Sequence, residues 1–89
     1  MCIENFKFLD IYNEKPDYLN EYDTILGYKV YHSSFNMLVY VIFDHNDNTY
    51  HSVQIVDPDF NLNITNILGW AIRIHFNMVI TVADFLVNF

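Results

Sequence analysis

The sequence predicts an α+β fold, a small antiparallel sheet of three to four strands with helices packed on one face. Two apolar segments separated by turn-forming residues lie between Gly27 and Asp57, a pattern typical of antiparallel strands. The segment that begins at Asp57-Pro58 instead has apolar residues at helical spacing. The chain has 89 residues, including 7 Tyr, 8 Phe and 1 Trp, and is therefore expected to form a single domain, 1–89, around one aromatic-rich core.

The central strands are expected between residues 28 and 56. Residues 35–43 are almost continuously apolar and rich in Val, Ile and Tyr, as in a strand that is covered on both faces. Residues 44–48 are turn formers, and residues 49–56 alternate between apolar and polar side chains as a second strand. Residues 28–32 provide a third strand, so that the three form an antiparallel meander.

The turn between the two later strands sets their register. If Asp47-Asn48 is a two-residue loop, Ile42 faces Val53 and Tyr40 faces Ile55. One face of the hairpin is then apolar throughout, which supports this choice of turn.

A short amphipathic helix is predicted to follow the sheet. Asp57 is a favourable N-cap, and Pro58 is favourable at the first helical position. Gly69 stands where a C-terminal stop is expected. The apolar stripe of this helix consists of Phe60, Ile64, Ile67 and Leu68.

Residues 70–88 fit two periods. Alternating apolar residues, many of them β-branched, favour a strand from Trp70 to Ile80, with Thr81 capping a last helix through Val87. The alternative is one long helix, because polar residues also recur at helical spacing, at Arg73, Asn77, Thr81, Asp84 and Asn88. No membrane span is expected here, since several of these polar side chains would lie in hydrocarbon.

The N-terminal third has the weakest pattern. Residues 3–12 mix apolar and charged side chains, and a first helix or an edge strand is expected there. Pro16 can open a short helix that places Tyr18 and Tyr22 one turn apart, alongside Asp17 and Glu21.

Acidic residues dominate the charge of the chain. There are 11 Asp and Glu against 4 Lys and Arg, with a formal net charge of −7. Six of the acids lie between Glu4 and Asp23, and no Lys or Arg occurs from Val30 to Ile72. Such a field repels nucleic acid and attracts basic protein surfaces, so direct nucleic-acid binding is not expected.

Tyrosines are interleaved with the acids. Tyrosine provides rigid contact area at interfaces, and carboxylates pair with Arg and Lys of a partner. The alternative is a solvated face with half-buried tyrosine rings. The predicted partner-binding residues are Asp17, Tyr18, Glu21, Tyr22, Asp23, Asp44 and Asp47.

No cofactor, metal or catalytic site is expected. The four His residues and Cys2 lack zinc-ligand spacing. Residues 44–55 do not match a calcium-binding loop, because Thr49 stands where the turn Gly is required and Ile55 stands where the closing Glu is required. None of the candidate nucleophiles lies in a nucleophile elbow or a Gly-rich phosphate loop. The protein is therefore expected to be non-enzymatic.

The expected compartment is the cytoplasm. Cys2 is the only cysteine, so no intrachain disulfide can form. After Met1-Cys2-Ile3, the first twenty residues contain four acids. They lack the apolar core that a signal peptide has.

The expected function is that of a small acidic inhibitor that binds the basic surface of a larger, nucleic-acid-handling protein. A phage or mobile-element antagonist of a host defence enzyme, such as an anti-CRISPR protein in the host cytoplasm, is of this physical type. Two alternatives stay open, a regulatory or structural homodimer with an apolar patch around 85–89, and an immunity protein or antitoxin that neutralises a toxin.

Overall fold

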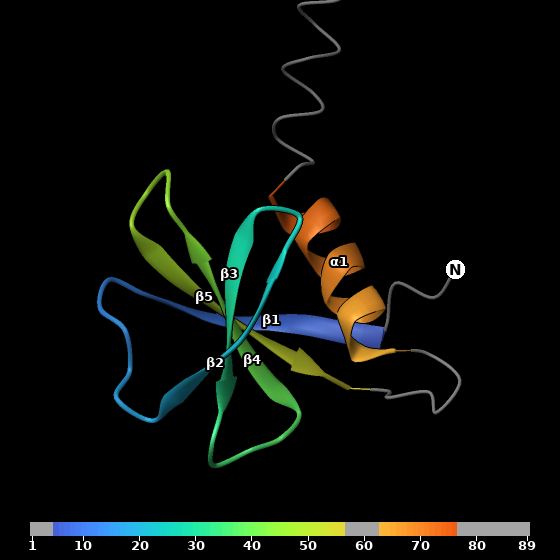
Figure 1. Cartoon of the computed structure of the whole chain (residues 1–89), viewed down its shortest axis with the longest axis horizontal. Helices are drawn as coiled ribbons and strands as arrows, with labels where there is room; N and C mark the ends of the chain where they lie inside the picture. The colour runs from blue at the N-terminus through green and yellow to red at the C-terminus, as the bar shows by residue number, and fades with distance from the viewer. Residues whose placement is uncertain (1–4, 57–62, 77–89) are drawn as a thin grey trace, which may run out of the picture.

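The computed structural model describes residues 5–56 and 63–76, which form a five-stranded antiparallel sheet and one helix (Figure 1). The elements are β1 (Phe6–Tyr12), β2 (Leu19–Ile25), β3 (Tyr28–Ser33), β4 (Val39–Asp44), β5 (Thr49–Ile55) and α1 (Ile64–His75). The strand order is β1-β5-β4-β3-β2. β2 to β5 therefore form a meander, and β1 is added beside β5, which leaves β1 and β2 as the edges.

The predicted fold class is wrong. The described residues are mostly sheet, with five strands and a single short helix, rather than three to four strands with helices packed on one face. The first source of the difference is the N-terminal third, where residues 6–12 form the edge strand that was one of two expectations. The short helix predicted after Pro16 does not form.

β2 occupies the place of that short helix. Its residues pair with β3 from Leu19, opposite Ser33, to Ile25, opposite Tyr28, with a bulge after Glu21. A helix of so few residues is marginal by itself, whereas pairing with β3 satisfies the backbone and buries the side chains at both ends of β2. Tyr18 and Tyr22 are consequently not one helical turn apart.

The meander of β3, β4 and β5 is confirmed, but its register differs from the prediction. Tyr40 pairs with Val53 and Ile42 with His51, so the predicted partners are displaced by two residues. A shift of two keeps each side chain on the predicted face. The reason is the turn, which spans 45–48 rather than two residues, because the Asp44 carboxylate accepts the backbone N–H of Asn46 at 3.0 Å.

The tight two-residue turn lies instead between β2 and β3. Leu26 and Gly27 connect the paired residues Ile25 and Tyr28, with φ of 53° and 84°. A type I′ hairpin turn requires positive φ at both central residues. Gly27 adopts this conformation without cost, whereas Leu26 adopts it at a cost of about 1–2 kcal/mol.

Helix α1 begins later and ends later than predicted. Asn63 is its N-cap, and the Asn63 side chain accepts the N–H of Thr65 at 2.8 Å. The predicted start at Asp57-Pro58 lies outside the described residues. Gly69 lies inside the helix and does not end it, and residues 70–75, predicted as strand, are helical.

This segment forms a helix rather than a strand because one side of the helix packs on the sheet. Ile67, Leu68, Ala71 and Ile72 are buried on one side of the helix, and packing of an apolar stripe overrides the strand preference of branched residues. The alternative of one long helix agrees with the structure as far as His75, and the helix predicted over 81–87 lies outside the described residues. Within 5–56 and 63–76, no helix has the length and hydropathy needed to cross a membrane.

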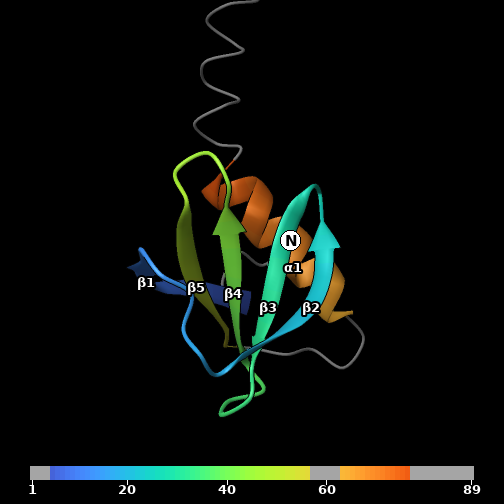
Figure 2. The same cartoon turned by 60° about the vertical axis from the view of Figure 1, so that its left-hand side comes forward.

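The main core lies between α1 and the sheet face that it covers (Figure 2). The other sheet face carries a smaller cluster of Leu19, Tyr31 and Val41, flanked by Phe43 and Tyr50. The ammonium group of Lys15 lies 5.4 Å from the centre of the Tyr31 ring on this second face. The core residues with no exposed surface are Val30, Ile42, Val53, Ile55, Leu68, Ala71 and Ile72.

Candidate functional site

The loop between β3 and β4 presents large apolar side chains to solvent. Phe35 is 82% exposed and Met37 is 75% exposed, and Leu38 is also exposed. The Tyr18 ring, at the start of β2, packs against the Phe35 ring with 5.2 Å between their centres. We call Tyr18, Phe35, Met37 and Leu38 the apolar tip. The prediction that residues 35–43 form a buried strand is therefore wrong for the first four of them, since β4 begins only at Val39.

The backbone of the tip is held in place by hydrogen bonds within the loop. The Ser33 hydroxyl oxygen accepts the N–H groups of Phe35 and Asn36, at 3.2 and 3.3 Å. The Asn36 side-chain oxygen accepts the N–H of Leu38 at 2.9 Å. The side chains of Ser33 and Asn36 thus fix the loop and leave its apolar side chains pointing outward.

Further hydrogen bonds join the tip to its neighbours. The N–H of Ser34 donates to the carbonyl oxygen of Tyr18 at 3.2 Å, and its hydroxyl group donates to the same oxygen. The carbonyl oxygen of Leu38 accepts the N–H of Ile55 at 2.8 Å. The backbone of the tip is therefore held in place, which reduces the backbone entropy that would be lost on binding through it.

An acidic edge adjoins the tip. β2 is an edge strand of the described sheet. Glu21 and Asp23 are exposed on it, and Asp17 is exposed just before it begins. The Glu21 carboxylate lies 3.1 Å from the Lys29 ammonium group and raises the pKa of Lys29. The Asp23 carboxylate accepts the N–H of Thr24 at 2.7 Å. We call Asp17, Glu21 and Asp23 the acidic edge.

The predicted partner-binding residues are only partly brought together. Tyr22 leans toward the helix, with its ring centre 5.1 Å from that of Tyr40 and its hydroxyl oxygen 3.4 Å from Thr65 Oγ1. Asp44 is 7% exposed and therefore unavailable to a partner. Asp47 is exposed in the β4–β5 turn, at the end of the sheet opposite the tip (Figure 2). Of the predicted residues, Tyr18 is thus part of the tip and Asp17 is its neighbour in the chain.

The sequence prediction missed Phe35 and Met37. These two side chains are apolar like those of β4, so the sequence pattern favoured one long strand over both segments. The signal that could have separated them is polar, because Asn36 interrupts the apolar segment directly after the turn formers Ser33 and Ser34.

A pair of histidines links the helix to the sheet. His51 Nδ1 on β5 lies 2.9 Å from His75 Nε2 on α1, and Thr49 Oγ1 lies 2.9 Å from His51 Nε2. The Phe8 ring stacks on His75 with 3.7 Å between centres. His51 is buried and pairs with Ile42 across β4 and β5.

Burial is the main reason that the pKa of both histidines is lowered, and Asp44 acts in the opposite direction on each. In the neutral pair one ring donates its N–H to the other. The Thr49 hydroxyl, His51 and His75 lie in one hydrogen-bonded series, and His51 is buried within it. Among the described residues, no group of three or more His, Cys, Asp or Glu side chains could hold a metal ion.

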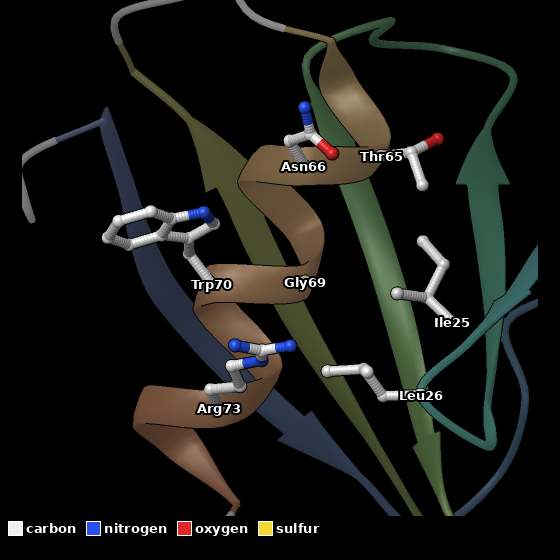
Figure 3. A pocket seen from close by; sticks show the side chains of 7 residues that line it. All are labelled: Ile25, Leu26, Thr65, Asn66, Gly69, Trp70 and Arg73. Atoms are coloured by element: carbon white, nitrogen blue, oxygen red, sulfur yellow. The ribbon is translucent and has the colours of Figure 1, made fainter. Parts of the chain in front are cut away.

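An open groove runs between α1 and the β2–β3 turn (Figure 3). Its volume is about 250 Å³, and its lining residues are Ile25, Leu26, Thr65, Asn66, Gly69, Trp70 and Arg73. A glycine in the middle of a helix costs about 1 kcal/mol relative to alanine. A Cβ atom added to Gly69 would meet only Ile25 Cγ2, at 3.8 Å, which is ordinary contact. Packing against the sheet therefore does not require glycine at this position.

Comparison of the chain with models of protein families, with curated proteins and with solved structures gave no match.

Proposed function

We propose that this chain is a non-enzymatic binding protein that docks through its apolar tip and acidic edge onto a larger protein and blocks it. The observation that carries the proposal is the exposure of Phe35 and Met37 on a loop whose backbone is fixed by hydrogen bonds. Exposed apolar side chains on an ordered loop are typical of interaction sites rather than of a solvated surface.

The tip has the properties of an interface centre. Aromatic residues in desolvated pockets contribute most of the binding free energy of many complexes. An aromatic side chain buries about 150–250 Å², which corresponds to about 4–6 kcal/mol at 25 cal/mol per Å² before the costs of association. Tyr18 supports Phe35 from the side, so the two rings would enter a partner pocket together.

The charge around the tip selects the partner. Asp17 precedes Tyr18 directly, and no Lys or Arg occurs between Asp17 and Thr24. Acidic residues around an apolar centre favour a pocket with Lys and Arg at its rim and increase the rate of association. Cytoplasmic proteins that handle nucleic acid have such basic surfaces. An antagonist of a defence enzyme, of anti-CRISPR type, and an immunity protein or antitoxin share this physical design.

The experiment compares capture of host-cell proteins by the wild-type chain and by two double variants. One variant carries Phe35→Ser and Met37→Ser. The matched control carries Leu9→Ser and Ile11→Ser on β1, which are also exposed apolar residues. We expect the control to capture the same protein as the wild type and the tip variant to lose it. Equal capture by all three proteins would contradict the proposal.

Two further measurements address the other occupants of the tip. Sedimentation of the wild-type chain reveals a homodimer, which the tip variant would dissociate. Flotation with neutral and anionic phospholipid vesicles reveals insertion into a bilayer. A net charge of −7 opposes both self-association and binding to anionic lipid. If the wild-type chain forms a homodimer or binds vesicles and the tip variant does not, the tip binds a second copy or a bilayer rather than a partner protein.

A further inference from the structure

We propose that the groove between α1 and the β2–β3 turn is a second binding site, for a small molecule that joins an apolar body to a carboxylate. This site lies at the end of β2 away from the apolar tip (Figures 1 and 3). It does not depend on the function proposed for the tip.

Two residues shape the groove against their local preference. Gly69 forms its floor in the middle of α1, where alanine would be more favourable and would fit. Leu26 forms a wall with φ of 53°, where asparagine or glycine would be more favourable. Gly69 removes a side chain from the hollow, and Leu26 adds an apolar one to it. Unusual backbone conformations such as that of Leu26 concentrate at binding sites.

The lining defines the chemistry of the ligand. Ile25, Leu26 and Trp70 offer apolar contact. Arg73 is the only charged residue in the lining, and within 5–56 and 63–76 it takes part in no ion pair. A guanidinium group favours carboxylates, which it can bind through two parallel hydrogen bonds. Figure 3 shows the Trp70 indole on the side of α1 away from Leu26, so an apolar body held on Ile25 and Leu26 would place its carboxylate at Arg73.

The size of the groove limits the ligand. Its volume of about 250 Å³ lies below the range of about 300–1,000 Å³ that is usual for drug-sized ligands. A molecule the size of one amino acid derivative fits this volume. The net charge of −7 opposes an anion at long range, but at physiological ionic strength charges are screened beyond about 8 Å. The local guanidinium group therefore dominates.

The test is an NMR titration of the full chain with 3-phenylpropionate, and with 3-phenylpropylamine as its cationic counterpart. We expect the acid to shift the Gly69 and Leu26 amide resonances saturably, with a Kd of about 1–10 mM for a ligand of about eleven non-hydrogen atoms. The amine should not saturate these shifts. Arg73→Gln should weaken binding about fivefold or more, whereas Lys29→Gln, the matched control outside the groove, should leave it unchanged.

Two further variants separate binding from folding. Gly69→Ala should raise the Tm by about 4 °C and weaken binding of 3-phenylpropionate at least about threefold, because it fills the floor. Leu26→Asn creates the favoured Asn-Gly turn, so it should also raise the Tm while weakening binding. The proposal is overturned if the acid and the amine behave alike, if Arg73→Gln binds as the wild type does, or if Gly69→Ala lowers the Tm.

Discussion

The helix-covered core and the apolar tip use similar side chains in opposite ways. In the core, Leu68 and Ile42 have no exposed surface and pack between α1 and the sheet. In the tip, Phe35 and Met37 are mostly exposed, although hydrogen bonds to the Ser33 and Asn36 side chains hold the backbone of the loop. The core residues stabilise the fold, whereas the tip residues contribute little to it and remain available for a partner.

This difference separates stability from binding. A substitution in the core should change the free energy of unfolding and affect binding only through the folded fraction. A substitution in the tip should leave unfolding almost unchanged and affect binding directly. The following predictions test that separation, from the largest expected change in stability to the smallest.

Leu68→Ala should lower the free energy of unfolding by about 3 kcal/mol, because it leaves a cavity beneath α1. Alanine has the highest helix propensity, so the loss would reflect packing alone. Urea denaturation followed by circular dichroism measures the effect. Ile11→Ala is the control, since Ile11 is 61% exposed and its loss should cost less than about 0.5 kcal/mol. Equal costs for both variants would mean that α1 does not pack as described.

Asn63→Ala should lower the free energy of unfolding by about 1 kcal/mol, because the first turn of α1 loses its N-cap. The effect is smaller than that of Leu68→Ala since the capping bond is exposed. Thermal unfolding at neutral pH provides the measurement. Asn66→Ala, one turn further on the exposed side of the helix, should leave the Tm unchanged or slightly higher.

The histidine pair should make the core, but not the tip, sensitive to pH. The folded state lowers the pKa of His51 and His75, chiefly through burial, so the unfolded chain binds more protons below its own histidine pKa of about 6.5. The stability contributed by the neutral pair is therefore complete above that pH and is lost as the pH falls through the lowered values. When one proton is added to the pair, one ring can still donate an N–H to the other. When a second proton is added, both facing nitrogens carry a hydrogen although they lie 2.9 Å apart.

Measuring the Tm from pH 7.5 to 5.5 avoids the titration of ordinary carboxylates near pH 4. His75→Phe keeps a ring to stack on Phe8 but removes one titrating group, and should reduce the pH dependence. His45→Gln, in the exposed β4–β5 turn, should retain it. A slope unchanged by His75→Phe would show that the pair does not titrate with unfolding.

Phe35→Ser should change the free energy of unfolding by less than about 0.5 kcal/mol, because the side chain is exposed and the loop is held by Ser33 and Asn36. Calorimetric unfolding of the wild type and the variant side by side would detect a larger loss. A cost near that of Leu68→Ala would mean that Phe35 belongs to the core and would remove the basis of the proposed interface.

The expectations that failed share a physical cause. Residues 35–38 and 70–75 are apolar enough for a strand, and composition does not tell a strand from an exposed loop or from a helix covering a sheet. The same limit applies to His51 and His75, which lie 24 residues apart in the chain and meet only because α1 packs across β5. Gly69 resembled a helix stop because propensity is local, whereas the packing that carries α1 past it is not.

Local patterns in the sequence specify the three central strands, the faces of their side chains and the concentration of acid in the first third of the chain. These follow from local alternation, turn chemistry and composition, which act over a few residues. The tertiary structure decided which edge carries β1, where α1 ends and which apolar side chains remain exposed. Those features depend on contacts between residues distant in the chain, because burial is a property of the assembled sheet and helix.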